Sequence, residues 1–305
     1  MKRSVLKYLP GSDSFLDPAR LDAETPEKAG VIVIPFGLEA SVSYGGGTRK
    51  GPQAILEASH QVELFDEELW REPYRDFGIA AVHEPKIPKS VEKALDVLEA
   101  QVEAVLDAGR MPFVLGGEHS LTAGAIRPFA RRFDDIAVLH FDAHADLRDG
   151  YQGEHYSHAA AMRRVLDHPN VSMVSVGLRA FSEPEAQFID ANAKRLHVHL
   201  AVNQARWDIE AIVKPLVGKS VYVTYDIDAL DGSIMPATGT PTPGGMGYLQ
   251  SLAILRRACE VSTIVGMDLV EFAPIKGFHA YDFLAAQLAA KMMYYARSGT
   301  KPRKR

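Results

Sequence analysis

Acidic and imidazole side chains recur at every second position in two short stretches of the sequence. The stretch LHFDAHADLRDGY places Asp142, His144 and Asp146 directly after an apolar run. The stretch DIDALD places Asp226 and Asp228 two positions apart. Crowded carboxylates repel one another and raise each other's pKa unless a positive group lies between them. We therefore expect a cation at the place where these side chains meet.

The spacing of these side chains suits metal binding. In an extended segment, residues two apart point to the same side and lie about 6.5–7 Å apart along the chain. Each stretch can therefore turn its alternate side chains toward one cavity. A carboxylate can bridge two cations about 3.5–4 Å apart, which is the separation found in two-metal hydrolases. Carboxylates and imidazoles without a thiolate favour Mn²⁺ and, less decisively, Fe²⁺, Co²⁺, Ni²⁺ or Zn²⁺.

Short β-branched runs alternate with longer helical patterns along most of the chain. This alternation predicts an α/β fold with a mostly parallel sheet and helices on both faces. The predicted strands are almost continuously apolar, as a sheet covered on both faces requires. They span residues 30–37, 111–117, 135–142, 171–177, 194–200, 219–226 and 262–268. The predicted helices span residues 90–109, 120–133, 157–167 and about 280–297, with further helices between the later strands.

The ends of the predicted strands carry the candidate ligands. In parallel α/β sheets, ligands bind beyond the carboxyl ends of the strands. In addition to the two stretches above, Glu118 and His119 follow one strand, and Asp268 and Glu271 come at the end of another. A lone Asp-x-His at a strand end is more often a capped turn than a metal site. Several such clusters at one edge of a sheet, however, predict a metal centre.

Two further polar residues are expected to support the site without binding metal. His140 alternates with Asp142 in an apolar strand, so we expect it to be buried and hydrogen-bonded behind the ligands. Asp231 is expected to orient a loop by accepting hydrogen bonds from backbone amides.

The overall composition is that of a globular protein. The chain has 305 residues, 47% of them hydrophobic, and a formal charge of -5. Nothing in this charge favours nucleic acid or an anionic membrane as a partner. No apolar run has the length of a membrane span, no secretory signal is recognisable, and the one cysteine, Cys259, fits a reducing compartment. We therefore expect a cytoplasmic protein.

No shift in composition divides the chain, so we expect a single domain over residues 1–305. An N-terminal extension, about residues 1–28, and a basic C-terminal tail, about residues 298–305, are expected to be peripheral. The glycine-rich segment 36–51 contains neither GxGxxG nor GxxxxGK(S/T), which leaves a nucleotide site unsupported. Its glycines are expected to let the backbone turn tightly beside a pocket or a subunit contact.

Four blocks of sequence occur in order between about residues 31 and 290: GGEHS, DAHAD, DIDALD with the following PATGTPTPGG, and EFAP. As a set they resemble the signature blocks of the ureohydrolase family, which comprises the arginases and the agmatinases. The segments SVSYGGGTRKGPQAIL and YSHAAAMRR are more similar to agmatinases, and the Gly-Asn-Leu-His-Gly type of block found in arginases is missing. The resemblance implies the arginase/deacetylase fold, a three-layer α/β/α domain, and usually a homo-oligomer, either a trimer or a hexamer.

The same resemblance implies roles for individual residues. Glu271 would hold the substrate guanidinium, His158 would be a nearby proton shuttle, and Thr240 would line the pocket. Two Mn²⁺ ions per subunit are implied, with Asp142 and Asp226 bridging them. One ion would be held by His119, Asp142, Asp146 and Asp226, and the other by Asp142, His144, Asp226 and Asp228.

The implied reaction is the hydrolysis of agmatine to urea and putrescine. Two divalent ions would turn a shared water into hydroxide, and Glu271 would set the guanidinium carbon above it. Asp146 would pass the proton to the leaving amine, and His158 would connect it with solvent. Gly232 stands where the family usually has proline, and Ala237 and Thr242 depart from the common agmatinase block. None of these departures is at a predicted ligand. They affect the prediction of which substrate is bound more than the prediction of which reaction is catalysed.

Other functions remain open from the sequence. The same chemistry could act on guanidinobutyrate, guanidinopropionate, aminopropylagmatine, arginine, formiminoglutamate or free guanidine. A catalytically silent metal-binding homologue is an alternative, although the intact ligand set argues against it. An enzyme of phosphoryl transfer that binds Mg²⁺ through DIDALD is another, but imidazole suits Mg²⁺ poorly and no phosphate loop is present.

Overall fold

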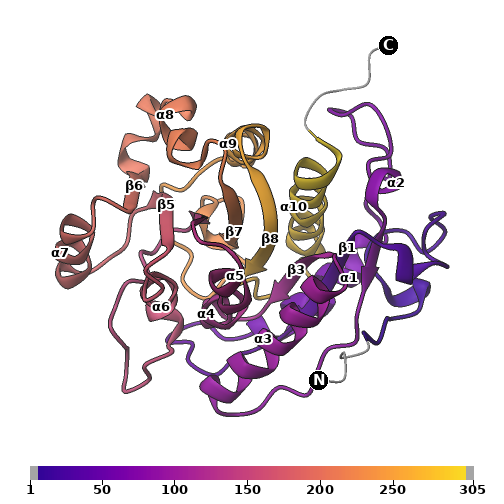
Figure 1. Cartoon of the computed structure of the whole chain (residues 1–305), viewed down its shortest axis with the longest axis horizontal. Coiled ribbons are helices and arrows are strands. Elements are labelled where there is room, and N and C mark those ends of the chain that lie inside the picture. The colour runs from indigo at the N-terminus through magenta and orange to yellow at the C-terminus, as the bar shows by residue number, and fades with distance from the viewer. Residues whose placement is uncertain (1–5, 300–305) are drawn as a thin grey trace.

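The computed structural model describes residues 6–299, which form an eight-stranded sheet with helices on both faces (Figure 1). The basic tail expected at residues 298–305 therefore lies almost wholly outside the described residues. All neighbouring strands are parallel, in the order β2-β1-β3-β8-β7-β4-β5-β6. The strands are β1 (Val31–Phe36), β2 (Ile79–Ala81), β3 (Met111–Gly116), β4 (Ile136–Phe141), β5 (Val171–Leu178), β6 (Leu196–Leu200), β7 (Ser220–Asp226) and β8 (Thr263–Val270).

Two layers of helices cover the two faces of this sheet, and Figure 1 shows α9 and α10 on one side and α3 and α6 on the other. One face packs against α1 (Gly51–Ser59), α2 (Tyr74–Phe77), α8 (Ile209–Val213), α9 (Tyr248–Val261) and α10 (His279–Ser298). The opposite face packs against α3 (Val91–Asp107), α4 (Thr122–Ala125), α5 (Arg127–Arg132), α6 (Ala161–Leu166) and α7 (Glu183–Ala191). Every residue of β1, β3 and β4 is buried, because both faces of these strands are covered. The predicted α/β/α architecture is confirmed.

The structure differs from the sequence expectation in the first third of the chain, where α1, α2 and β2 were not expected, and in the helix expected over residues 120–133. Strand β2 was not expected, because three residues carry too little periodicity to be recognised. The helix expected over residues 120–133 is broken into a 3₁₀ turn, His119–Leu121, followed by α4 and α5. Pro128 lacks the N–H that would continue the helical hydrogen-bond ladder, and the chain accommodates it in the first turn of α5.

The described part of the N-terminal segment packs into the core, whereas the sequence suggested a peripheral extension. Phe15 and Leu16 are fully buried in the cluster that covers one face of the sheet. The backbone N–H of Leu9 donates to the carbonyl of Ala81 at 2.8 Å, so this segment also covers the outer edge of β2. A short apolar pair outside any regular element gave no recognisable signal in the sequence.

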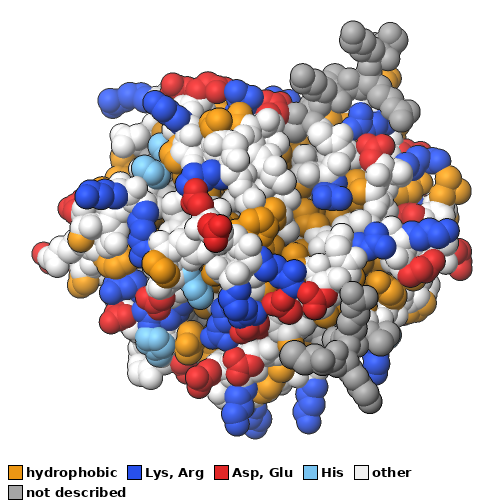
Figure 2. All heavy atoms as spheres, in the orientation of Figure 1, with side chains coloured by type: hydrophobic (Ala, Val, Ile, Leu, Met, Phe, Trp, Pro, Cys, Tyr) orange, Lys and Arg blue, Asp and Glu red, His pale blue; other side chains and the backbone are white. Residues whose placement is uncertain are grey.

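Within residues 6–299, no helix combines the length and the apolar character needed to cross a membrane. On the face shown in Figure 2, basic and acidic side chains are interspersed over the surface.

Candidate active site

Four adjacent strands, β3, β8, β7 and β4, bring the candidate residues to one edge of the sheet. His119 lies in the 3₁₀ turn after β3, Asp142 follows β4, Asp226 ends β7, and Glu271 follows β8. Because the strands are parallel, their carboxyl ends meet at the same edge. The fold thereby brings together segments as far apart in sequence as His119 and Glu271.

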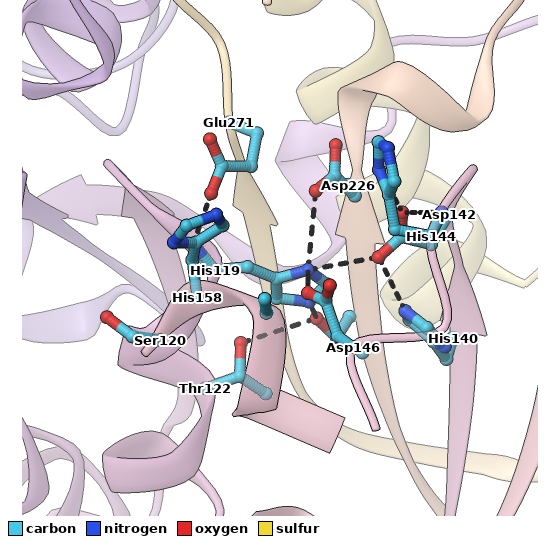
Figure 3. A network of polar contacts seen from close by, with 12 residues as sticks. His119, Ser120, Thr122, His140, Asp142, His144, Asp146, His158, Asp226 and Glu271 are labelled. Atoms are coloured by element: carbon cyan, nitrogen blue, oxygen red, sulfur yellow. Dashed lines mark hydrogen bonds and ion pairs between the residues drawn. The ribbon is translucent and has the colours of Figure 1, made fainter. Parts of the chain in front are cut away.

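His119 lies at the centre of the cluster (Figure 3). Its Nδ1 atom lies 3.1 Å from Asp142 Oδ2, 3.1 Å from Asp146 Oδ2 and 3.3 Å from Asp226 Oδ2. This nitrogen is buried, and it makes no hydrogen bond of acceptable geometry to any residue in the described part of the chain. Three carboxylate oxygens and one ring nitrogen therefore converge on a common point without bonding one another.

The hydrogen bonds on the opposite side of the His119 ring fix its tautomer. Nε2 lies 2.9 Å from Thr224 Oγ1, and the hydroxyl hydrogen of Thr224 goes to Asp268 Oδ1 at 2.6 Å. Nε2 must therefore be the donor, and in a neutral imidazole Nδ1 is then a lone pair. Since a lone pair facing three carboxylates is repulsive, the cluster needs a proton or a metal cation at its centre.

A second group of side chains surrounds His144. Its Nδ1 atom lies 3.0 Å from Asp228 Oδ2 and 3.6 Å from Asp142 Oδ1. Burial lowers the pKa of His144, but the charges of Asp228 and Asp142 outweigh burial and raise the pKa to about 12. Asp142 thus turns one carboxylate oxygen toward each imidazole, as a carboxylate that bridges two cations would be placed.

The remaining acids are held in an unfavourable electrostatic environment. Burial, followed by the charges of Asp228 and Asp142, raises the pKa of Asp226 well above its usual value. Burial and the charge of Asp142 also raise the pKa of Asp146. Burial alone would raise the pKa of Asp142 as well, but the neighbouring histidines, His119 first and then His140 and His144, hold it well below its usual range when their rings carry positive charge. Four carboxylates with two imidazoles match the charge and the ligand chemistry of two divalent cations.

The two residues expected to support the site do so by hydrogen bonding. His140 is buried, with Nδ1 3.0 Å from Ser175 Oγ and Nε2 2.8 Å from Asp142 Oδ2. Since both ring nitrogens have partners, His140 orients the Asp142 carboxylate. Asp231 accepts hydrogen bonds from loop amides, including that of Gly244 at 2.6 Å. Both expectations are confirmed.

Two other acids at strand ends lie outside the cluster. The carboxylate of Glu118 accepts hydrogen bonds from the backbone amides of Ala40 and Ser41 at 2.6 and 2.7 Å, and so fixes the loop that follows β1. Asp268 is fully buried within β8 and accepts hydrogen bonds from three buried hydroxyl groups. These belong to Thr122, Tyr222 and Thr224, at 2.9, 2.7 and 2.6 Å. Through Thr224, Asp268 is connected to the His119 ring.

A cavity of about 160 Å³ opens onto the cluster, and Glu271, His158 and Thr240 line it. The Glu271 carboxylate accepts a hydrogen bond from the backbone N–H of His119 at 2.6 Å. Burial, with a contribution from the nearby charge of Glu118, raises the pKa of Glu271 to about 8. The fold therefore places all three of these predicted residues at one cavity.

Two of the predicted residues have strained backbone conformations. Asp146 has φ 51° and Glu271 has φ 63°, in the left-handed region. Such a conformation costs on the order of 1–3 kcal/mol and persists only where surrounding contacts determine it. At Glu271 the backbone N–H donates to the carbonyl of Gly117 at 2.8 Å. Gly117 must itself be glycine, because a Cβ there would lie 2.0 Å from the carbonyl oxygen of Leu38.

Part of the cavity wall was not singled out in the sequence. Residues 42–45, together with Arg148 and Tyr151, line the same cavity. The glycine-rich segment was expected to lie beside a pocket or a subunit contact. Its composition did not indicate which of its side chains would line the cavity. Ser41 Oγ and Ser43 Oγ lie 3.2 and 3.4 Å from the two ring nitrogens of His158.

The sequence of this chain is similar to known ureohydrolases over most of its length. Residues 28–295 match the Arginase family. An N(1)-aminopropylagmatine ureohydrolase from Synechocystis sp. is 35% identical over 299 residues, which cover 95% of this chain and 95% of that protein. An agmatinase from Bacillus anthracis is 34% identical over 255 residues, which cover 82% of this chain and 85% of that protein.

Solved structures show the same fold. The agmatine ureohydrolase of Thermoplasma volcanium aligns with a TM-score of 0.81 and 26% identity, over 97% of this chain and 96% of that chain. The proclavaminate amidino hydrolase from Streptomyces clavuligerus aligns with a TM-score of 0.83 and 25% identity, over 98% of this chain and 99% of that chain. On the extent of the family match and the identity to these relatives, the chain belongs to the arginase family and is a ureohydrolase.

Proposed function

We propose that this protein is a dimanganese hydrolase that cleaves the guanidinium group of agmatine to give urea and putrescine. The observation that carries this proposal is the convergence of four carboxylates and two imidazoles beside a cavity lined by Glu271 and His158. Relatives named agmatinase and N(1)-aminopropylagmatine ureohydrolase support a guanidino substrate.

The proposed metal ligands are the six side chains of the cluster. His119, Asp142, Asp146 and Asp226 would hold one Mn²⁺, and Asp142, His144, Asp226 and Asp228 the other. The unpartnered Nδ1 of His119 and the mixture of carboxylate and imidazole donors fit such ions. When bound, two divalent ions supply Lewis-acid chemistry, which lowers the pKa of a water molecule toward neutrality.

Glu271 is proposed to bind the substrate guanidinium. One of its carboxylate oxygens is fixed by the backbone N–H of His119 at 2.6 Å, which sets the plane of the carboxylate. A guanidinium beside it would offset the effect of burial, so that the carboxylate is ionised in the complex. Charge-assisted hydrogen bonds would then hold the guanidinium carbon in one position relative to the cluster.

Asp146 and His158 are proposed to move the proton. The Asp146 carboxylate would accept a proton from the attacking water and deliver it to the leaving amine. His158 would exchange that proton with solvent, as a histidine side chain can do near neutral pH. Ser41 Oγ, 3.2 Å from Nδ1 of His158, is placed to orient its ring.

N(1)-aminopropylagmatine is a second candidate substrate, favoured by the shape of the site. A second cavity of about 270 Å³ shares His144, Asp146, Arg148 and Ala159 with the first and extends to Phe181. This recess offers room for a tail longer than that of agmatine.

Urea release from a panel of guanidino compounds tests the proposal. Protein dialysed against a chelator should release no urea, and added Mn²⁺ should restore hydrolysis, with agmatine giving the highest kcat/KM. Elemental analysis should find two metal ions per subunit in the active protein. No urea from any guanidine after Mn²⁺ loading would contradict the hydrolase assignment. A higher kcat/KM for N(1)-aminopropylagmatine would replace agmatine as the substrate.

A further inference from the structure

The ring of Tyr44 projects from the cavity wall into solvent. Tyr44 lines the cavity beside the cluster, yet its side chain is 88% exposed. Exposed aromatic rings at the mouth of a cavity provide a face on which a ligand can stack.

The backbone that carries Tyr44 is anchored on both sides, although the ring is free. A Cβ on Gly45 would lie 2.7 Å from the carbonyl oxygen of Gly239, so the two segments approach backbone to backbone. The Glu39 carboxylate accepts a hydrogen bond from the backbone N–H of Arg49 at 2.8 Å, which closes the base of the loop. The backbone of Tyr44 is therefore held at the mouth before a ligand arrives, so the ordering cost of binding falls mainly on the side chain.

The other tyrosine of this wall already has a cationic partner. The Arg148 guanidinium lies 5.0 Å from the ring centroid of Tyr151, and the His158 ring packs edge-on against the same ring. Arg148 Nε is also 3.8 Å from the carboxylate of Glu185. Among residues 6–299, no cationic or aromatic side chain lies over the ring of Tyr44. The available aromatic face at the mouth is thus that of Tyr44.

The charges of the cavity indicate what chemistry this face would bind. In the proposed function the four carboxylates of the cluster are matched by metal ions, and Glu271 is matched by the guanidinium. The tail of the substrate then lies toward the mouth. A carboxylate tail would meet the negative face of the ring, while the charge of Arg148 is already shared with Glu185. An ammonium tail would be attracted by the ring.

We propose that Tyr44 is a specificity-determining residue, whose ring binds the terminal ammonium group and the adjoining methylenes of an amine-tailed guanidine. This proposal rests on the proposed function and adds to it the chemical class of the tail and the side chain that selects it.

The experiment compares Tyr44→Leu and Tyr44→Phe in the Mn²⁺-loaded protein with agmatine, butylguanidine and 4-guanidinobutyrate. Tyr44→Leu should raise KM for agmatine about two- to fivefold with kcat retained, the size of an exposed cation–π contact. For butylguanidine, KM should change by less than about twofold, because leucine keeps the apolar contact. Tyr44→Phe retains the ring and should restore the KM for agmatine. Phe65→Leu, which removes a partly exposed ring outside this cavity, should leave all three substrates unaffected.

Two outcomes would overturn the role of Tyr44. One is an equal rise in KM for agmatine and butylguanidine in Tyr44→Leu, and the other is no rise for agmatine. If the Mn²⁺-loaded proteins release no urea, calorimetric titration with agmatine and butylguanidine gives their dissociation constants directly. If no urea is released but Tyr44→Leu binds agmatine more weakly than the unmodified protein does, the role of Tyr44 stands and the hydrolase proposal is refuted. If urea is released and the KM for agmatine is the same in both proteins, the hydrolase proposal stands and the role of Tyr44 is refuted.

Discussion

Two regions of the molecule gather acidic side chains around a cavity, and they differ in where the positive charge comes from. The larger cavity, of about 300 Å³, lies between residues 62–68 and helices α9 and α10. There Lys291 Nζ lies 2.7 Å from Asp66 Oδ2, and Arg256 pairs with Glu68. At the strand-end cavity of about 160 Å³, no lysine or arginine within residues 6–299 pairs with the four carboxylates of the cluster.

The difference separates a structural ion-pair network from a binding site. In the larger cavity the chain supplies its own cations, so the acids are satisfied without a ligand. At the strand ends the chain supplies only imidazoles, and His119 Nδ1 is left as a lone pair among carboxylates. A proton on each ring or a cation from outside the chain must therefore balance these carboxylates, because no lysine or arginine within residues 6–299 pairs with them. Unmatched charge, more than the volume of a cavity, marks the functional site.

Asp142→Asn should produce the largest effect, because this side chain faces both imidazoles of the cluster. We expect metal content to fall and kcat/KM to drop about 10³-fold or more, as expected when several kcal/mol of metal-derived transition-state stabilisation is lost. Elemental analysis and urea release measure the two effects. Asp66→Asn, in the larger cavity, is the matched control and should leave both unchanged. Normal metal stoichiometry in Asp142→Asn would show that the strand-end cluster does not depend on Asp142 to bind a cation.

Glu271→Gln should separate substrate binding from metal binding. The amide keeps the size of the side chain but loses the charge, so kcat/KM should fall about 100-fold, the upper range for a hydrogen bond to a charged group. The metal content should remain that of the unmodified protein, since Glu271 is not one of the proposed ligands. Full activity in this variant would remove Glu271 from the guanidinium role.

The sequence predicts the cluster well because its geometry depends on strand ends. The apolar runs of β3, β4, β7 and β8 are unambiguous, and a parallel sheet has only one edge at which their carboxyl ends can meet. Asp142, His144, Asp226 and Asp228 could therefore be placed together without knowledge of the strand order.

The surroundings of the cluster are less predictable because they depend on contacts between irregular segments. Ser41 lies 117 positions from His158 in the sequence, and no periodicity predicts that the loop after β1 contacts the turn that carries His158. Tyr44 reaches the mouth only because Gly45 packs against Gly239, a contact between two loops. Asp268 looked like another strand-end ligand, but the pleat of β8 turns it toward buried hydroxyl groups, of which Thr224 is one.

Asp268→Asn should have an intermediate effect, because Asp268 acts on the cluster through Thr224 and the His119 ring. Without this charge, Thr224 should accept the hydrogen bond from His119 Nε2 less strongly, so the His119 tautomer is less firmly fixed. The Mn²⁺ concentration at half-maximal activity should then rise about 10- to 100-fold. At saturating Mn²⁺, kcat should approach that of the unmodified protein. Thr122→Val removes a different hydroxyl donor to Asp268 and should shift the Mn²⁺ titration less. An unchanged titration in a stably folded Asp268→Asn protein would refute this role.

Lys291→Met should have the smallest effect on activity and act on stability alone. Lys291 is largely buried, and it lies 2.7 Å from Asp66 and 3.1 Å from Glu67. Removing the ammonium takes away the ion-pair partner of the buried Asp66 carboxylate, which keeps the backbone N–H of Leu69 as a donor at 2.7 Å; this loss should cost about 1–3 kcal/mol in the free energy of unfolding. Denaturant titration measures this cost, while kcat/KM and metal content should be unchanged because the cation of this region belongs to the chain. If a Lys291→Met protein bound a metal ion in the larger cavity, the acids of that cavity could also bind a cation from outside the chain. The difference between the two regions would then depend on a single lysine side chain.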